Sequence, residues 1–446
     1  MSIINLPASK SIGARFLVAS YFADTLPECR RFSDCDDLKV IQEALLDLYR
    51  SSKEPSHTPL SLDIHASGTA FRFMAATVAS TSGADVVLTG TKRLCSRPMT
   101  PLLEVLRQAG ASVEALGENG SGPYHIKGSH LKGGDFEIRG DVSSQFISAL
   151  MLAAPTWNGG MRLRFTTRLV SRPYAEMTAN VMRDFGIDVE FSEEGVSVKE
   201  GRYIAPADYT VEADWSAAGF IYEAATFMLR PVYIADLISP EKSMQGDSAT
   251  AEIFRYLGMV SEFHSKDGTI ETKDHQLMIP YGYQTDCSGD YAIIQRYFEL
   301  PDEVKFDMTD CPDLVPALAL SCAFNGIRFR LTGVRNLRLK ESDRLEAIRA
   351  ELEKFGYHLK VEDDAISWCG GVWGRLDDPL IETYDDHRIA MAFAIGALRK
   401  GEMRISNPDV VDKSFSDFWN QLPKLDLTCR REGDVMVVTH NENSWL

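Results

Sequence analysis

The chain has 446 residues, 44% hydrophobic and 25% charged, which is typical of a folded water-soluble protein and too long for one ordinary core. Its formal net charge of −17 argues against binding to nucleic acid or anionic membranes. No long uncharged apolar run occurs, and the start, MSIINLPASK, does not resemble a signal peptide. The eight cysteines show no CxxC or Cys/His clustering, which argues against a zinc site or disulfide framework and favours a cytoplasmic protein.

Two kinds of helix are expected along the chain. The first kind is apolar on nearly every side and starts with small or polar residues, which is typical of buried helices. In chain order these segments are 9–23, 67–80, 143–154, 214–228, 312–324 and 385–398.

The second kind begins as an amphipathic helix, ends at a glycine and continues as an alternating stretch that predicts a strand. These segments are 102–116, 178–192, 250–264 and 348–362. The first three glycines, Gly110, Gly186 and Gly258, recur at intervals of about 75 residues. The pattern predicts about six repeated α/β units, each with one buried and one amphipathic helix packed against strands.

Polar residues gather where the buried helices begin. Helix N-termini present unpaired N–H groups and a positive dipole end, so several that converge would bind an anion. Taken singly, each Ser, Thr or Asp is more typical of an N-cap. The residues in question are Lys10, Ser11, Arg15, Ser67, Gly68, Thr69, Ser143, Ser144, Gln145, Asp313, Asp386, His387 and Arg388.

Several arginines strengthen the case for an anionic ligand. Arg15 and Arg388 lie in otherwise apolar helices, and Arg97 precedes Pro98 at an expected helix start. Arg344 stands in the first turn of a helix, where a cation is unfavourable unless an anion compensates it. Buried arginines need carboxylate or phosphate partners, and internal Asp or Glu would satisfy them. The number of cations at helix starts favours a bound ligand with several negative charges.

From end to end the chain resembles the 5-enolpyruvylshikimate-3-phosphate synthase family of enolpyruvyl transferases. VSSQF, LKESDRL and DDHRIAMAF in this order are specific together, although none would suffice alone. The similar motifs are LPASKSIGAR (6–15), SGTAFR (67–72), RPMTPLLEVLRQAGA (97–111), VSSQFISALMLAAP (142–155), SRPYAEMTANVM (171–182), EADWSAAGF (212–220), CPDLVPALAL (311–320), NLRLKESDRL (336–345), YDDHRIAMAF (384–393) and DKSFSDFW (412–419).

The resemblance implies an α/β fold of two globular domains, an inside-out α/β barrel in which each domain has three repeated α/β units with buried parallel helices. The first domain would be 11–212. The second would be 213–446, completed by the N-terminal strand within 1–10. The active site would lie in the interdomain cleft, and the domains would close on their anionic ligands.

The resemblance also implies the reaction. The 5-hydroxyl of shikimate 3-phosphate adds to C2 of phosphoenolpyruvate, and the tetrahedral intermediate then loses phosphate. The substrates are small molecules, neither a metal nor an organic cofactor is needed, and the protein is expected to be a monomer. The enzyme serves the shikimate pathway to chorismate and the aromatic amino acids and is the target of glyphosate.

Site residues follow from the resemblance motif by motif. Asp313 would accept the proton of the 5-hydroxyl and Glu341 would protonate the methylene carbon, with Lys10 and His387 as further catalytic residues. His387 and Lys413 would take part in proton handling, or would only orient Glu341 and neutralise phosphate. Shikimate 3-phosphate would be held by Lys10, Ser11, Arg15, Ser143, Ser144, Gln145, Ser171, Tyr174, Asp313, Asn336 and Lys340. Phosphoenolpyruvate would be held by Lys10, Gly68, Arg97, Gln145, Arg344, Arg388 and Lys413.

The chain departs from the family pattern at Ala8, at Gly13-Ala14 and at Ala66, where the family has Gly, Ser-Asn and Asn. Ala66 removes an amide beside the expected phosphoenolpyruvate pocket, and we expect this to change the affinity for phosphoenolpyruvate or glyphosate. One alternative is the related transferase acting on UDP-N-acetylglucosamine, which uses a loop cysteine, although Cys95 is better explained as a passive loop residue. The other alternative is a non-catalytic anion-binding protein.

Overall fold

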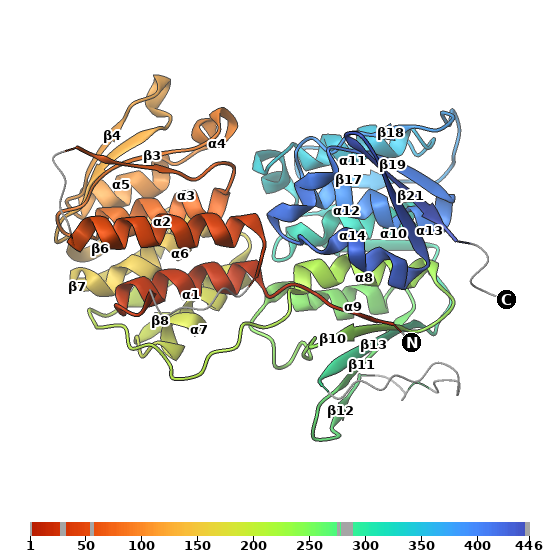
Figure 1. Cartoon of the computed structure of the whole chain (residues 1–446), viewed down its shortest axis with the longest axis horizontal. Coiled ribbons are helices and arrows are strands. Elements are labelled where there is room, and N and C mark those ends of the chain that lie inside the picture. The colour runs from red at the N-terminus through yellow and green to blue at the C-terminus, as the bar shows by residue number, and fades with distance from the viewer. Residues whose placement is uncertain (1, 27–32, 54–57, 274–276, 278–288, 442–446) are drawn as a thin grey trace. The chain divides into compact units, whose positions relative to one another are not determined.

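The computed structural model describes residues 2–26, 33–53, 58–273, 277 and 289–441. Contacts divide the chain into two compact units. Unit 1 comprises Met1–Ser9 with Glu212–Leu446, and unit 2 comprises Lys10–Val211. Figure 1 shows the elements of each unit. None of the described helices is both long enough and apolar enough to cross a membrane.

The predicted repetition is confirmed by four sheets that share one βαβαββ pattern and by a fifth that has one extra strand, β12. In each, the first two strands are parallel, and a buried helix precedes the second strand, because parallel neighbours need a crossover. In the first sheet of unit 1, the connection from β1 to β10 also contains the whole of unit 2. An amphipathic helix then leads to the remaining strands. The last strand pairs antiparallel with the second, and the third strand pairs antiparallel with the last.

In unit 2 one such sheet has the order β2(Leu60–Asp63), β3(Asp85–Thr89), β5(Tyr124–Lys127), β4(Ser112–Ala115), with α3(Gly68–Ala79), α4(Lys92–Ser96) and α5(Thr100–Gln108). The other has the order β6(Lys132–Ile138), β7(Asn158–Phe165), β9(Gly195–Val198), β8(Val189–Phe191), with α6(Ser144–Ala153) and α7(Arg172–Asp184). Two further helices are α1(Lys10–Phe22) and α2(Asp36–Lys53).

In unit 1 the first sheet has the order β1(Ile3–Ile4), β10(Val232–Ala235), β13(Tyr291–Arg296), β11(Met259–His264), β12(Ile270–Glu271), with α8(Trp215–Phe227) and α9(Thr250–Arg255). The second has the order β14(Glu303–Asp307), β15(Arg328–Thr332), β17(Ala365–Trp368), β16(Lys360–Val361), with α10(Val315–Asn325) and α11(Arg344–Glu353). The third has the order β18(Leu380–Ile381), β19(Glu402–Ser406), β21(Val435–His440), β20(Leu427–Glu432), with α12(His387–Ile395), α13(Ala397–Lys400) and α14(Phe418–Gln421).

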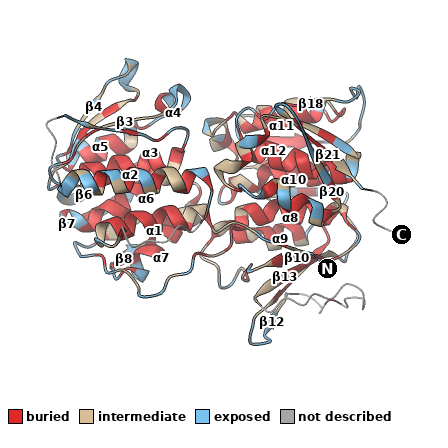
Figure 2. Ribbon diagram, viewed as in Figure 1, coloured by how far each residue is buried: buried red, intermediate tan, exposed pale blue. Residues whose placement is uncertain are grey.

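The helices predicted to be buried are buried. Figure 2 shows α1, α3, α6, α8, α10 and α12 in red along most of their length. A helix that is apolar all round gains from burial on every face, roughly 2 kcal/mol for each large aliphatic side chain removed from water. Their N-terminal residues are therefore held by rigid, closely packed supports.

The amphipathic helices end as predicted, at glycines with positive φ. Gly186 has φ 79° and Gly356 has φ 85°, the left-handed conformation in which a glycine closes a helix at little steric cost. The helix α2(Asp36–Lys53), whose Leu38, Ile41 and Leu45 form a buried stripe, was not predicted. The helix α7 begins at Arg172, six residues before the predicted start, with Pro173 in its first turn, a position where proline favours a helix start.

The described residues of unit 2 contain two sheets. The segment after β9 carries aromatic rings that pack on helices instead of pairing as a strand. The ring of Tyr209 lies 4.5 Å from that of Phe16, and the ring of Tyr203 lies 5.9 Å from that of Phe22. This side of α1 is therefore covered by side chains of the segment at 199–211.

The N-terminal strand β1 belongs to unit 1. It pairs in parallel with β10, Ile3 opposite Tyr233 and Ile4 opposite Ile234. The Ser9 N–H donates to the Glu212 carbonyl at 2.7 Å, where the chain passes to Lys10 and α1. Lys10, a predicted site residue, therefore begins both unit 2 and its first buried helix.

Candidate active site

In unit 1 the predicted site residues come together at the starts of three helices. Asp313 lies in the 3₁₀ turn Pro312–Leu314 before α10, Arg344 begins α11, and Arg388 lies in the first turn of α12. Lys340 and Glu341 precede α11, and Lys413 ends the 3₁₀ turn Pro408–Lys413. We call Asp313, Lys340, Glu341, Arg344, Asp386, Arg388 and Lys413 the arginine–carboxylate cluster.

Arg344 is at the centre of this cluster and is 1% exposed. Its Nη1 donates to Asp313 Oδ1 at 2.8 Å and its Nη2 to Glu341 Oε2 at 2.9 Å. Its Nε donates to Asp386 Oδ2 at 2.7 Å. Burial lowers the pKa of this guanidinium, but the three carboxylates outweigh burial and raise it.

The charge of Arg344 at its helix start is therefore balanced without a ligand, and its predicted contact with phosphoenolpyruvate stays a prediction. The structure supplies carboxylates of the chain itself as counterions, the alternative that sequence reasoning had left open. The planar guanidinium presents its donors as a fork, so one arginine holds three acids in a fixed arrangement. The helix dipole is offset in the same way, because Glu341 and Asp386 lie beside the first turn.

Asp313 is surrounded by cations. Its Oδ1 lies 3.2 Å from Lys340 Nζ as well as accepting from Arg344, and its Oδ2 accepts from Arg388 at 3.0 Å. Burial raises the pKa of the Asp313 carboxyl, but Arg388, Lys340 and Arg344 prevail and hold it well below its usual value. Asp313 is therefore an ionised hydrogen-bond acceptor at neutral pH.

Glu341 bridges two cations at the start of α11. Its Oε2 accepts from Arg344, and its Oε1 lies 3.2 Å from Lys413 Nζ. The predicted proton donor to carbon is thus within direct reach of Lys413. His387 is 1% exposed, with its Nδ1 3.9 Å from Asp386 Oδ1, too long for a hydrogen bond. Its predicted role in orienting Glu341 stays a prediction.

Two further aspartates lie in this region: Asp386, expected only at a helix start and not assigned to a ligand, and Asp247, which was not expected at the site. Asp386 is the N-cap of α12, accepting the Arg388 N–H at 3.0 Å. Asp247 is 3% exposed and accepts from the Ser216 hydroxyl. Burial and the negative charge of Asp313 raise the pKa of Asp247 to about 6, against the opposing effect of Arg388. Asp247 was missed because GDSA around it resembles an ordinary turn.

In unit 2 the predicted residues also lie at helix starts. Lys10 forms an ion pair with Asp37 of α2 at 3.0 Å. Ser143 is the N-cap of α6, and the Gln145 side chain donates to Thr69 Oγ1 of α3 at 3.0 Å. Ser171 is the N-cap of α7 with φ 52°, a strained backbone conformation that is concentrated at functional sites.

Gly68 and Arg97 are brought together at the start of α3. A Cβ added to Gly68 would lie 2.7 Å from Arg97 Nη1 and 3.2 Å from Arg72 Nη1. Arg72 also donates to the Gly68 carbonyl at 3.0 Å. Only a glycine lets the two guanidinium groups approach the helix N-terminus so closely. Arg72, which the sequence analysis did not single out, is part of this arrangement.

Arg15 has a role in packing that the sequence did not reveal. Its Nε donates to Thr178 Oγ1 at 2.7 Å, and its Nη2 donates to Ser148 Oγ at 3.2 Å and the Tyr174 carbonyl at 2.9 Å. These contacts join α1 to α6 and α7. Burial lowers the pKa of Arg15 to about 10, which still leaves it charged at neutral pH. Its partners are hydroxyls and carbonyls instead of the acids found in unit 1.

The remaining predicted residues and departures are placed as follows. Ser11 follows Lys10 in α1, Ser144 begins α6, Tyr174 lies in α7 and Asn336 lies in the 3₁₀ turn Arg335–Leu339. A Cβ on Gly13 would meet Leu38 at 2.9 Å, so the close packing of α1 on α2 explains this glycine. Cys95 is buried, and its thiol donates to the Gly90 carbonyl at 3.5 Å, as expected of a passive residue.

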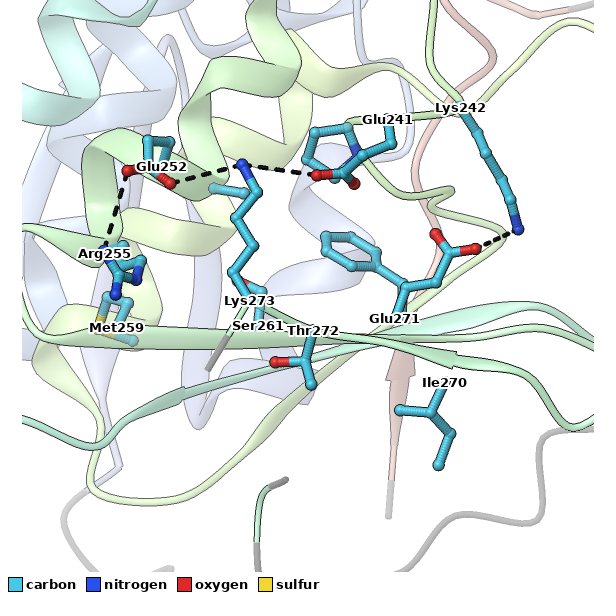
Figure 3. Close-up of a pocket in the computed structure, with 13 residues that line it drawn as sticks. Glu241, Lys242, Glu252, Arg255, Met259, Ser261, Ile270, Glu271, Thr272 and Lys273 are labelled. Atoms are coloured by element: carbon cyan, nitrogen blue, oxygen red, sulfur yellow. Dashed lines mark ion pairs between the residues drawn. The ribbon is translucent and has the colours of Figure 1, made fainter. Parts of the chain in front are cut away.

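Unit 1 also has a cavity of about 330 Å³ between β11, β12 and α9 (Figure 3). Lys273 lies 3.5 Å from Glu241 and 3.6 Å from Glu252, and Lys242 lies 2.5 Å from Glu271. Its cations are thus paired with its own acids, and no residue of the arginine–carboxylate cluster is among the described residues that line it. The described residues also include no group of three or more His, Cys, Asp or Glu arranged to hold a metal ion.

Comparisons with known proteins agree with the motifs. The profile of the family described as EPSP synthase (3-phosphoshikimate 1-carboxyvinyltransferase) matches residues 1–422. A 3-phosphoshikimate 1-carboxyvinyltransferase of Bacteroides fragilis is 36% identical over 423 residues, 94% of each chain. One of Vibrio cholerae is 31% identical over 441 residues, 95% of this chain and 96% of the relative. The solved EPSP synthase of Acinetobacter baumannii has the same fold, with a TM-score of 0.68 at 22% identity over 98% of this chain and 96% of that one.

Proposed function

This chain belongs to the EPSP synthase family, and from that premise we propose how its residues perform the family's reaction. The enzyme transfers the enolpyruvyl group of phosphoenolpyruvate to the 5-hydroxyl of shikimate 3-phosphate and releases phosphate. This reaction belongs to the shikimate pathway, which leads to the aromatic amino acids. The family match favours it over transfer to UDP-N-acetylglucosamine and over a non-catalytic role.

The reaction has two steps. In the addition, the 5-oxygen loses its proton and bonds to C2 of phosphoenolpyruvate, while C3 gains a proton and becomes a methyl group. In the elimination, the bond from C2 to the phosphate oxygen breaks and C3 loses a proton, which restores the double bond. The protein must therefore remove and supply protons at two atoms close together.

The observation that carries the assignment of roles is the double contact of Arg344 with Asp313 and Glu341. One rigid guanidinium holds the proposed base and the proposed acid. Preorganised groups of this kind avoid reorganisation during the reaction. We assign Asp313 to the hydroxyl proton and Glu341 to C3, with Lys413, 3.2 Å away, resupplying the proton to Glu341.

The low pKa of Asp313 makes it a weak base until its surroundings change. Lys340 and Arg388, which hold its carboxylate, are also the cations proposed to bind substrate phosphate and carboxylate groups. Substrate anions placed against these cations share their positive charge and raise the proton affinity of Asp313. The base would then be activated only when the substrates are bound.

Substrate binding is divided between the residues of the two units in this proposal. The proposal is supported by the fact that each unit carries buried cations at helix starts. In unit 2 the proposed ligands are Lys10, Ser11, Arg15, Gly68, Arg97, Ser143, Ser144, Gln145, Ser171 and Tyr174. In unit 1 they are Asp313, Asn336, Lys340, Arg344, Arg388 and Lys413, with His387 as a further catalytic residue.

Phosphate release tests the roles. Wild-type protein should release phosphate only when both substrates are present. Glu341→Gln should lose at least about two orders of magnitude in kcat, the usual contribution of general acid–base catalysis. Glu346→Gln is the matched control, because Glu346 lies in the first turn of α11, which Glu341 precedes, forms an exposed ion pair with Arg349 and should leave kcat unchanged. Equal kcat values for the two variants would contradict the role of Glu341.

A binding experiment tests the division between the units. Arg97→Ala in unit 2 and Lys413→Ala in unit 1 should each weaken binding of phosphoenolpyruvate in the presence of shikimate 3-phosphate. Lys92→Ala, an exposed cation of α4, should leave it unchanged. If only one of the two variants, Arg97→Ala or Lys413→Ala, weakens binding, phosphoenolpyruvate does not contact residues of both units.

A monomeric state and a cytoplasmic location complete the proposal. The six described cysteines are all without a disulfide, as in proteins of reducing compartments. Light scattering coupled to size-exclusion chromatography tests the monomer, for which a mass near 49.7 kDa is expected.

A further inference from the structure

The turn that leads into α12 is closed by the Asp386 N–H, which donates to the Thr383 carbonyl at 2.9 Å. The two residues between them, Tyr384 and Asp385, have φ 54° and φ 55°. Turns with positive φ at both central positions favour glycine, asparagine or aspartate there. Asp385 follows this preference, but Tyr384 does not, because a large side chain in the left-handed region is costly. Contacts outside the turn must therefore hold Tyr384 in this conformation.

Tyr384 is anchored to α11 by its side chain. Its hydroxyl donates to Glu351 Oε1 at 2.7 Å. Glu351 is 0% exposed, although Tyr384 as a whole residue is 44% exposed. Burial, and then the hydrogen bond to Glu351, raise the pKa of the Tyr384 hydroxyl, so this group remains a donor at physiological pH. A hydrogen bond to a buried carboxylate is strong, and this one fixes the position of the tyrosine.

Glu351 is itself held in place by two further donors. Its Oε2 accepts from Lys354 Nζ at 2.6 Å and from the Glu382 N–H at 3.1 Å. Lys354 also donates to the Leu380 carbonyl at 2.6 Å. The carboxylate therefore connects α11 to the segment 380–384 through both of its oxygens, and the lysine balances its charge. Tyr384 thus bonds to a group whose position is already determined, and the turn is constrained with it.

The same turn has contacts beyond Tyr384. Asn407 Nδ2 donates to Asp385 Oδ1 at 2.7 Å, and Asn407 is the N-cap of the 3₁₀ turn Pro408–Lys413. The next residue of the chain, Asp386, is bound to the start of α11 by its ion pair with Arg344. Three successive residues are therefore each hydrogen-bonded to another part of unit 1.

We propose that Tyr384 is a positioning residue for the reaction: its hydrogen bond to Glu351 holds the turn 383–386 in its left-handed conformation and so places Arg388 for phosphoenolpyruvate. This inference rests on the proposed function, in which Arg388 binds that substrate. Arg388 lies in the first turn of α12, and its Nη2 donates to Asp313 Oδ2 at 3.0 Å. The chain between the turn and Arg388 is short, so a change of φ at Tyr384 would be passed to the start of α12 and displace the guanidinium.

A turn that served only to connect β18 and α12 would not need a tyrosine. Glycine adopts positive φ at little cost and would form the same turn with less strain. A tyrosine is favourable here only if its side chain gains more than the backbone loses, and the gain that the structure shows is the bond to Glu351. Strain of this kind is concentrated at functional sites, and this turn leads directly into two residues of the arginine–carboxylate cluster, Asp386 and Arg388.

Steady-state kinetics of Tyr384→Phe tests the inference, because this variant keeps the ring and removes the hydroxyl. It should raise KM for phosphoenolpyruvate roughly tenfold, the effect of losing one hydrogen bond to a charged group, and change KM for shikimate 3-phosphate less than about twofold. Tyr256→Phe is the matched control, because Tyr256 is 58% exposed, packs edge-to-face on Phe306 and should leave both constants unchanged. A lower kcat of Tyr384→Phe with both KM values unchanged would show only a loss of folded protein and would overturn the proposal.

A second variant separates the hydrogen bond from the shape of the turn. Tyr384→Gly keeps positive φ without strain but has no hydroxyl, so we expect the same rise in KM for phosphoenolpyruvate as in Tyr384→Phe. Wild-type constants in Tyr384→Gly would show that the turn needs only its backbone, which contradicts the proposal. Circular dichroism during heating checks that both variants are folded at the assay temperature.

Arg388→Ala distinguishes a failure of this inference from a failure of the proposed function. It should raise KM for phosphoenolpyruvate at least as much as Tyr384→Phe does. If Arg388→Ala raises this constant and Tyr384→Phe does not, only the inference about Tyr384 is wrong. If Arg388→Ala leaves it unchanged, Arg388 does not bind this substrate, and both the role proposed for Arg388 and the inference are wrong.

Discussion

Arg344 and Asp386 form a two-point ion pair in the interior of unit 1. Arg344 Nε lies 2.7 Å from Asp386 Oδ2 and its Nη2 lies 3.2 Å from Oδ1, and the two residues are 1% and 0% exposed. The pair joins the start of α11 to the start of α12, where Asp386 is also the N-cap. Because the pair is closed to water, removing one partner leaves an uncompensated charge.

Asp386→Asn should therefore lower the free energy of unfolding by about 3 kcal/mol, although asparagine still caps α12. Urea unfolding measures this. The control is Asp343→Asn: Asp343 caps α11, accepting the Glu346 N–H at 3.2 Å, but its side chain is 37% exposed. That variant should lose less than about 1 kcal/mol. Equal losses would show that capping, and not the buried charge pair, sets the stability.

Arg344→Lys keeps the positive charge but removes the planar guanidinium group with its several N–H donors. A single ammonium cannot meet Asp313, Glu341 and Asp386 with the same geometry, so both proposed acid–base residues lose their positions. We expect kcat/KM to fall roughly a hundredfold, the usual effect of misplacing catalytic groups by about 1 Å.

Arg349→Lys on the same helix is the control for this change, because its ion pairs with Glu346 and Glu353 are on the surface. Its kcat/KM should match the wild type, and circular dichroism should show both variants folded. If Arg344→Lys retains wild-type kcat/KM, charge alone is sufficient at this position.

The carboxyl of Asp247 should make stability depend on pH between about 4 and 6. Its pKa rises from 3.8 unfolded to about 6 folded, so the folded state binds more protons in this range. The contribution of Asp247 to the free energy of unfolding is present below pH 4 and is lost as the pH rises through 6. The loss is at most about 3 kcal/mol.

The measurement is the difference in unfolding free energy between wild type and Asp247→Asn at several pH values. From pH 4 to pH 7 the free energy of unfolding of the wild type should fall relative to that of Asp247→Asn. Asp409→Asn should show the opposite sign, because a hydrogen bond from Arg431 lowers the pKa of Asp409 and its contribution is lost as pH falls. A flat difference for Asp247 would contradict the prediction.

Gly68→Ala should raise KM for phosphoenolpyruvate about tenfold and leave KM for shikimate 3-phosphate nearly unchanged. The new Cβ would lie 2.7 Å from Arg97 Nη1, so this guanidinium must shift away from the helix start. Initial-rate kinetics with each substrate varied in turn separates the two constants. Equal changes in both would indicate a general distortion of α3.

Ala66→Asn restores the amide that the resemblance leads one to expect. Ala66 is exposed just before Ser67, the N-cap of α3, so an asparagine side chain is free of steric conflict with the core. One added hydrogen bond should lower KM for phosphoenolpyruvate and the inhibition constant of glyphosate about fivefold. Unchanged constants would show that the departure at Ala66 is neutral.

Local sequence predicted much of this architecture. The buried helices, the glycines that end the amphipathic helices and the repeated units depend on periodicity and backbone geometry, which the chain carries locally. The helix α2 and the aromatic covering at Tyr203 and Tyr209 were missed, because neither has a glycine end or a repeated position to mark it. The positions of the site residues at helix starts were predictable for the same local reason.

Which of these groups contact one another was decided only by the tertiary structure. The sequence showed Arg344 as a cation at an unfavourable helix start, but Asp313 lies 31 residues before it and Asp386 lies 42 residues after it. Arg15 likewise resembled the other buried arginines, yet packing gave it hydroxyl and carbonyl partners and gave Arg344 carboxylates. Composition and spacing determine which charges a chain has and which helix each begins. The partners of these charged groups, and therefore their pKa values, depend on the packing of the core. That packing decides which side chains at the N-termini of different helices come within about 3 Å of each other.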